Sequence, residues 1–153
     1  MRPTVLERIV PQLRRHEGEH LTAYLCPSGK VTIGVGHNME ANPVPGLPAV
    51  VGTRINADQS RRLLIADLMA FDREMLEALP WVSSLDDARY GVLLNMAFNL
   101  GVLRLCEFKN TLRAVQDARW DDAANGMLAS KWAKQVKGRA IELAQQMRIG
   151  SWQ

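Results

Sequence analysis

One short stretch of strand-type sequence most restricts how this protein can fold. Elsewhere in the chain, the apolar residues recur at helical spacing. Over residues 21–37, the β-branched and aromatic residues that favour strands lie on both sides of the turn signal Pro27-Ser28-Gly29. This pattern predicts a β-hairpin or a small meander. Three prolines and two glycines over residues 42–52 predict a loop after it.

A helix should precede the hairpin, because apolar residues over 4–16 repeat at the spacing of one helix face. Pro11 interrupts the pattern, either as a kink in one helix or as the first residue of a second helix, where its missing N–H costs nothing. We favour the second interpretation, since a helix that opens at Pro11 would end near Glu17 and Gly18.

The chain after the loop is helical in pattern. Asn56 and Gln59 form a capping-box pair at the start of a long helix that should stop at Pro80. Further helices are predicted from Asp86 or Asp87 to near Gly101, and over residues 107–116, 121–128 and 139–147.

These elements predict one α+β domain of 153 residues that is mostly helical and contains a small sheet. A β-containing lobe over roughly residues 10–60 would face a larger helical lobe over 61–153, with a cleft between them. The residues expected to pack in the helical lobe are Met96, Phe98, Leu100, Leu112 and Trp132.

Charge and composition narrow the function classes. The net charge of +3 and the pI near 9.1 suit a polyanionic partner, either nucleic acid or the anionic bacterial wall. Lys and Arg are scattered rather than clustered, which argues against a nucleic-acid-binding face. No apolar run approaches the roughly 18 residues of a membrane helix, and the N-terminal sequence has no signal-peptide pattern. We therefore expect accumulation in the cytoplasm, without stable membrane insertion.

Glu17 stands out by its position, at the end of the predicted helix and directly before Gly18. A single Glu is usually a solvated surface group. A carboxylate at a helix C-terminus, however, faces the negative end of the helix dipole and should be hard to ionise unless a cation compensates it. This property is what a general acid near neutral pH requires.

Cys26 and Thr32 flank the predicted hairpin turn. Free cysteine is usually a small buried hydrophobe, but a place beside the turn favours exposure or a cleft. Cys106 is the only other cysteine and lies far away in the sequence, so we expect free thiols rather than a disulfide. Because strands alternate faces, Thr32, Gly34 and Gly36 should share one side, where the glycines leave room for a close approach to the backbone.

His37 ends the predicted hairpin and has two interpretations. Three histidines and a cysteine, with His16 and His20 four residues apart, suggest a zinc site. Two observations argue against it: Gly18 would break the helix between these histidines, and no ligand pair recurs at zinc-finger spacing. A lone His more often holds a hydrogen bond or an ion pair, and Asp67 on the long helix is the candidate partner. We expect no metal and no cofactor.

The stretch HEGEHLTAYLCPSGKVTIGVGH, residues 16–37, resembles the active-site segment of the phage-type lysozymes of T-even and lambdoid phages (glycoside hydrolase family 24). Their pattern is Glu, eight residues, Asp or Cys, five residues, Thr, and then Ile-Gly-x-Gly-His, which Glu17, Cys26, Thr32 and residues 33–37 match. Similar stretches follow in the order and spacing of the family at residues 85–89, 94–99, 108–112, 119–121, 130–132 and 150–152.

The resemblance implies the two-lobed lysozyme fold and a muramidase, an endolysin that hydrolyses the β-1,4 bond between N-acetylmuramic acid and N-acetylglucosamine in peptidoglycan. It implies that Glu17 protonates the departing glycosidic oxygen and that Thr32 helps to place the attacking water. Asn95 and Asn99 would hydrogen-bond the glycan, and Arg139 matches the basic residue that faces the catalytic Glu.

Cys26 is the departure that matters, because the family pattern has Asp there, with Cys as a recognised variant. A neutral thiol stabilises an oxocarbenium-like transition state less than a carboxylate does, whereas a thiolate could stabilise it, orient water or attack the anomeric carbon. Sequence leaves these options open, and the resemblance favours direct displacement by water, with inversion. His37 and Asp67 fall on a structural ion pair of the family.

An endolysin of this kind would be a monomer that stays in the host cytoplasm until a holin lets it reach the cell wall. Three alternatives stay open: a non-catalytic wall-binding protein on the same fold, a helical nucleic-acid binder, and a lytic transglycosylase in which the sugar's own hydroxyl attacks. The presence of Glu17 and Thr32 argues against the first, and the scattered basic residues argue against the second. Cys26 and Thr32, which suit added water, argue against the third.

Overall fold

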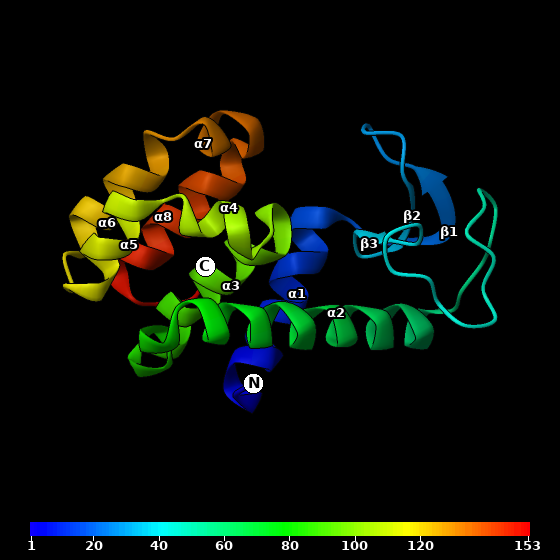
Figure 1. Ribbon diagram of the computed structural model, residues 1–153, viewed down its shortest axis with the longest axis horizontal. Coiled ribbons are helices and arrows are strands. Elements are labelled where there is room, and N and C mark those ends of the chain that lie inside the picture. Colours follow the sequence, from blue (N-terminus) through cyan, green and yellow to red (C-terminus); the bar gives the residue numbers. More distant parts are fainter. The chain divides into compact units, whose positions relative to one another are not determined.

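The computed structural model covers residues 1–153 and contains a small antiparallel sheet and a larger set of helices (Figure 1), which confirms the α+β prediction. The chain forms two compact units, one of Val10–Met69 and one of Met1–Ile9 with Ala70–Gln153. In chain order the elements are α1 (Pro3–Glu17), β1 (His20–Leu25), β2 (Val31–Gly34), β3 (His37–Asn38), α2 (Ala57–Ala78), the 3-10 helix η1 (Pro80–Ser84), α3 (Asp87–Leu100), α4 (Val102–Cys106), α5 (Lys109–Gln116), α6 (Trp120–Leu128), α7 (Lys131–Val136) and α8 (Gly138–Ile149).

The N-terminal helix is continuous, so the prediction of a second helix opening at Pro11 is wrong. α1 runs from Pro3 to Glu17 with Pro11 inside it. An interior proline costs about 3 kcal/mol. Val5, Ile9 and Leu13 form one apolar stripe past that position and are fully buried, and burying each such side chain stabilises by roughly 1.5–3 kcal/mol. The buried stripe therefore outweighs the proline.

The predicted hairpin is confirmed, and a third strand extends it into a sheet of order β1-β2-β3. Its turn, Pro27-Ser28-Gly29, ends with Gly29 at a φ of 80°. A left-handed residue at that place is typical of a three-residue hairpin loop. The Cys26 N–H donates to the Lys30 carbonyl at 2.9 Å and closes the hairpin.

The core of the unit Val10–Met69 lies between the sheet and the chain that follows it. The predicted loop is present, and its end returns beside β1 through a bridge between Thr22 and Arg54. This return covers apolar side chains of the strands. The buried cluster consists of Ala23, Val31, Ile33, Met39 and Ile55.

The long helix α2 begins with the predicted capping box. Oδ1 of Asn56 accepts the N–H of Gln59, and Oε1 of Gln59 accepts the N–H of Asn56, each at 2.8 Å. The helix ends at Ala78, and η1 starts at Pro80 as the next element. None of the helices, α2 included, combines the length and the apolar composition that a membrane span requires.

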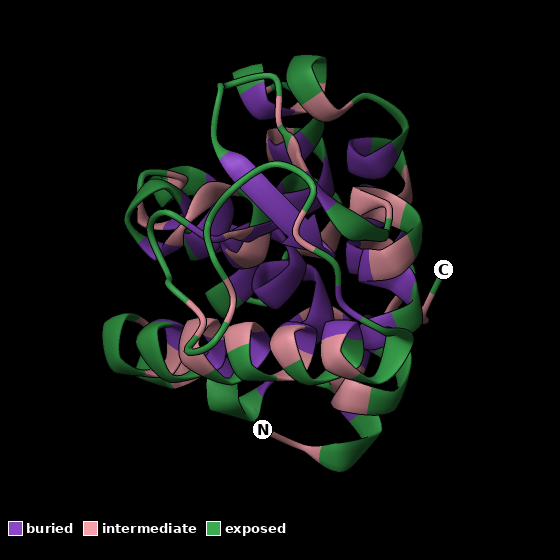
Figure 2. Ribbon diagram, turned by 90° about the vertical axis from the view of Figure 1, so that its right-hand side faces the viewer, coloured by how far each residue is buried: buried purple, intermediate pink, exposed green.

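α3 is the most deeply buried helix, since every residue from Tyr90 to Ala97 is buried. Along other helices, buried purple and exposed green residues alternate (Figure 2). Phe98 and Leu100 are half-buried, because they lie where α3 reaches its end at Gly101. Phe98 packs in this unit as predicted, with 5.5 Å between its ring centroid and that of Phe71. The other predicted core residues of this unit are buried: Met96, Leu112 and Trp132.

Three short helices, α4, α7 and η1, have no counterpart among the predicted elements. Each has six residues or fewer, which is too short to show a helical period in the sequence. The longer predicted helices after the loop are all present, with ends shifted by a few residues.

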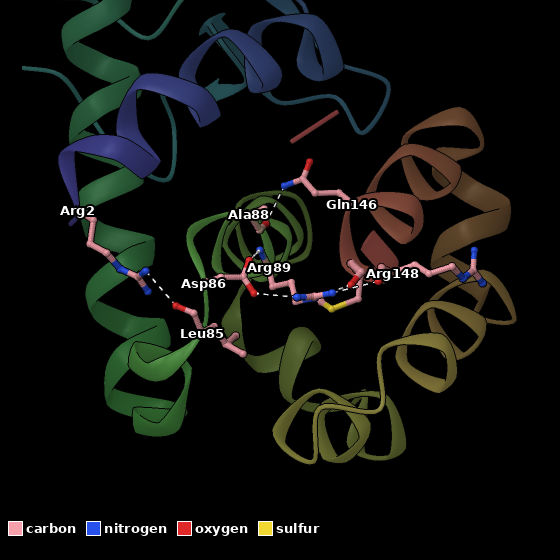
Figure 3. Close-up of polar contacts among 8 residues, drawn as sticks. Arg2, Leu85, Asp86, Ala88, Arg89, Gln146 and Arg148 are labelled. Carbon is pink, nitrogen blue, oxygen red and sulfur yellow. Dashed lines mark hydrogen bonds and ion pairs between the residues drawn. The ribbon is translucent and has the colours of Figure 1, made fainter. Parts of the chain in front are cut away.

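Arg89 of α3 holds the end of α8 (Figure 3). Its Nε donates to the Met147 carbonyl at 2.7 Å and its Nη2 to the Arg148 carbonyl at 3.0 Å. Carbonyls in the last turn of a helix have no hydrogen-bond donor within the helix, and here the guanidinium of Arg89 is that donor. The same group lies 3.9 Å from the ring centroid of Trp120, which adds a cation–π contact.

Candidate active site

Glu17 is the last residue of α1, as predicted, and is half-buried. The N–H of Gly18 donates to the Arg14 carbonyl at 3.0 Å, and Gly18 has a φ of 75°, the left-handed conformation that commonly ends a helix. The turn between β2 and β3 brings Gly36 against the carboxylate, since a Cβ added there would lie 3.4 Å from Oε2 of Glu17. The helix end and this turn together define where the carboxylate lies.

The two glycines of the hairpin make room for protein groups. A Cβ on Gly34 would lie 3.2 Å from Oγ of Ser60 on α2. Gly34 and Gly36 have φ values of 64° and 67°, and β2 ends at Gly34. Because alternation requires extended backbone, the expectation that Gly36 shares one side of a strand with Thr32 is wrong.

Cys26 and Thr32 are tied to one backbone carbonyl. The carbonyl of Lys30 accepts the N–H of Cys26 at 2.9 Å and the hydroxyl of Thr32 at 3.0 Å. Thr32 is buried and is paired with Tyr24 in the register of β1 and β2. Cys26 is half-buried, and its thiol and that of Cys106 are free, as expected from the sequence.

Hydrogen bonds lower the pKa of Cys26 to about 7. The largest contribution comes from the Ser28 hydroxyl, whose Oγ lies 3.0 Å from Sγ of Cys26. The pKa of Tyr24 is raised, first by burial and then by the negative charges of Cys26 and Glu17. Glu17 and Cys26 thus both lie near enough to Tyr24 to act on it electrostatically, and Thr32 belongs to the same unit.

His37 and Asp67 form the pair that the sequence predicts. Nδ1 of His37 lies 2.7 Å from Oδ2 of Asp67, and its Nε2 lies 2.8 Å from the carbonyl oxygen of Asn42. The hydrogen bond with Asp67 raises the pKa of His37, although burial opposes this. The pair therefore links β3 to α2.

Asn95, Asn99 and Arg139 belong to the helical unit. Asn95 is fully buried, and its Oδ1 accepts hydrogen bonds from Nε and Nη2 of Arg139 at 3.0 and 2.7 Å. Asn99 is exposed, and its Oδ1 accepts a hydrogen bond from Nε1 of Trp132 at 2.8 Å. Neither pairing was foreseen, because both join residues that are more than 30 positions apart in the sequence.

The histidines do not form a metal site with other ligands. No group of three or more His, Cys, Asp and Glu side chains is placed to hold a metal ion. His20, part of the zinc alternative, packs its ring against Tyr24 with 4.3 Å between the ring centroids. Its side chain thus has a packing role on β1.

Comparison with known proteins identifies the family. The model of the phage lysozyme family matches residues 14–148. This chain belongs to the phage lysozyme family. It is therefore a lysozyme, a glycoside hydrolase that acts on peptidoglycan.

Three relatives illustrate the likeness of this lysozyme to known proteins. The endolysin of Salmonella phage P22 is 32% identical over 91% of this chain and 90% of its own length. Probable T4-type lysozyme 1 of Dictyostelium discoideum is 26% identical over 96% of this chain and 97% of its own length. The pre-baseplate central spike protein Gp5 of Enterobacteria phage T4 is 27% identical over 91% of this chain, but the match spans only 27% of Gp5.

Asp67→Asn should destabilise this lysozyme most at mildly acidic pH. Because the folded-state pKa of His37 is raised, its pairing with Asp67 stabilises the fold fully below about pH 6.5, and the stabilisation is lost as pH rises through the folded value. We expect the free energy of unfolding in urea to fall by about 1.5–3 kcal/mol near pH 6, and by clearly less at about pH 9.

The matched control is Arg62→Gln, which breaks the exposed ion pair of Arg62 with Asp58 on the same helix. Exposed pairs contribute little, so the control should change the free energy of unfolding by less than about 1 kcal/mol at either pH. An equal loss for Asp67→Asn at both pH values would contradict the role given to protonated His37.

Proposed function

We propose that this lysozyme is a muramidase, which hydrolyses the β-1,4 bond between N-acetylmuramic acid and N-acetylglucosamine and thereby lyses bacterial cells. The observation that carries the proposal is the grouping of Glu17, Cys26 and Thr32 in one unit. Within it, the backbone N–H of Cys26 and the hydroxyl of Thr32 both donate to the carbonyl of Lys30. These side chains offer a proton donor, a proton acceptor and a group that holds water. Hydrolysis of a glycoside by direct attack of water needs all three.

In the proposed reaction, protonated Glu17 gives its proton to the glycosidic oxygen while the bond from that oxygen to the anomeric carbon breaks. Water held by Thr32 attacks the anomeric carbon from the opposite face, and the thiolate of Cys26 takes a proton from this water. Glu17 is left as a carboxylate and Cys26 as a thiol, and a proton returns from the thiol to the carboxylate through solvent. One water is added, and the anomeric configuration inverts.

The polar residues of the helical unit are proposed to bind the glycan or to support the groups that do. Since Oδ1 of Asn99 accepts a bond from Trp132, the amide N–H groups of Asn99 are its donors to a sugar. Asn95 is fully buried, so we propose that it supports the site and does not contact the glycan itself. Arg139 donates twice to Asn95 and fixes that side chain.

The proposed route to the substrate is that of a phage endolysin. We infer that the protein acts as a monomer, without metal or cofactor, and stays in the host cytoplasm until a holin lets it reach the cell wall. The likeness to the endolysin of Salmonella phage P22 supports this route. The net charge of +3 suits the anionic wall.

Glu17→Gln should abolish the clearing of permeabilised Gram-negative cells. Glutamine keeps the shape of the side chain but has no proton to give, and a general acid contributes roughly 100-fold or more to the rate. We expect the turbidity of a cell suspension to fall with the unchanged protein and to stay nearly constant with the variant. The matched control is Glu7→Gln, an exposed glutamate of the same helix, which should clear normally.

Equal clearing by Glu17→Gln and the unchanged protein would show that Glu17 is not the acid. If neither protein clears the cells, while the unchanged protein is folded and binds peptidoglycan, the non-catalytic wall-binding alternative would replace the muramidase.

Cys26→Ala should lose most of the activity, whereas Cys26→Asp should keep a substantial part of it. Alanine leaves no group to take a proton from water, and this loss should slow clearing by roughly 100-fold. Aspartate is ionised above about pH 4, so the clearing rate of Cys26→Asp should change little as the pH rises through about 7. The rate of the unchanged protein should increase over that range, because the Cys26 thiol ionises with a pKa of about 7. The control is Cys106→Ala, and full activity in Cys26→Ala would remove Cys26 from the mechanism.

A further inference from the structure

The side chain of Ser28 contacts the sulfur of Cys26 from within the same turn. Oγ of Ser28 lies 3.0 Å from Sγ of Cys26. Two backbone bonds fix the chain around this contact: Gly29 N–H donates to the Cys26 carbonyl at 2.8 Å, and Cys26 N–H donates to the Lys30 carbonyl at 2.9 Å. The turn therefore holds the hydroxyl beside the sulfur.

We propose that Ser28 is a positioning residue of the active site, whose hydroxyl donates a hydrogen bond to Sγ of Cys26 and keeps the sulfur as the thiolate that takes a proton from water. The inference rests on the proposed function, in which Cys26 is that proton acceptor. The direction of the bond follows from chemistry, because a thiolate has no proton and the serine must donate.

Cys26 needs a hydrogen-bond donor if its sulfur is to be a thiolate at neutral pH. An ordinary cysteine has a pKa of about 8.5, so only a few per cent is thiolate at neutral pH. The hydrogen bonds of the turn, with that of Ser28 the largest, bring the pKa of Cys26 to about 7. About half of the sulfur is then ionised at neutral pH.

The ionisable groups around Cys26 do not replace the serine. Glu17 and Tyr24 bear negative charge when ionised and so would disfavour a thiolate. The pKa of Tyr24 is raised first by burial and then by the charges of Cys26 and Glu17. The carboxylate of Glu40 is bound to the backbone of β2 at 2.9 Å and adds no cation. Lys30 is the cation of the turn, but it is exposed, so water screens its charge.

Alkylation of Cys26 by iodoacetamide at different pH values tests the proposal without any need for turnover. The full chain with Cys106→Ala has one thiol, and only the thiolate reacts. The midpoint should lie near pH 7 for this protein, move towards about 8.5 with Ser28→Ala, and return towards the first value with Ser28→Thr, which keeps the hydroxyl. An unchanged midpoint in Ser28→Ala would overturn the proposal.

Clearing of permeabilised cells at about pH 7 gives the second readout. Ser28→Ala should lower the rate by up to about tenfold, following the thiolate fraction, and Ser28→Thr should recover most of it. In a Cys26→Asp background, Ser28→Ala should change little, because aspartate is ionised without help. An equal loss in both backgrounds would show that Ser28 merely shapes the turn. Because alkylation needs no catalysis, it decides the role of Ser28 even if Glu17→Gln disproves the muramidase.

Discussion

The close approach between the carboxylate of Glu17 and the backbone of Gly36 joins the end of α1 to the small sheet. A side chain on Gly36 would come within 3.4 Å of Oε2, and its φ of 67° lies in the left-handed region that favours glycine. The carboxylate meets this turn only because α1 ends at Glu17, where Gly18 stops the helix. The buried stripe that carries α1 through Pro11 therefore also places the proposed acid.

A single carbonyl organises the other half of the proposed site. The carbonyl of Lys30 accepts hydrogen bonds from the Cys26 backbone and from the Thr32 hydroxyl, so Cys26 and the residue proposed to hold the water share one anchor. A sulfur differs physically from the carboxylate of the family pattern, because aspartate is ionised at neutral pH without help and a thiol is not. In our proposal, the hydrogen bond between the Ser28 hydroxyl and Sγ of Cys26 compensates for that difference by favouring the thiolate.

Local signals made much of this structure predictable from sequence. The capping box of Asn56 and the hairpin turn depend on neighbouring residues. The pairing of His37 with Asp67 was expected because a lone His usually holds a hydrogen bond or an ion pair, and the family resemblance agreed with it. The continuity of α1 was not predictable, because burial by distant residues decided against the break that Pro11 suggests locally. The sequence indicated Ser28 only as a turn residue, although a hydroxyl two positions after a cysteine, in a tight turn, is a local signal for contact with the sulfur.

The chain ends left in digested peptidoglycan test the central claim, that this lysozyme adds water to the muramyl bond. Purified peptidoglycan is digested, the products are reduced chemically, and the terminal sugars are identified by mass spectrometry. Reducing N-acetylmuramic acid ends are the predicted result. Ends of the 1,6-anhydro type would show that the sugar's own hydroxyl attacks, and reducing N-acetylglucosamine ends would show that a different bond is cut. Either result would contradict the mechanism built on Glu17, Cys26 and Thr32.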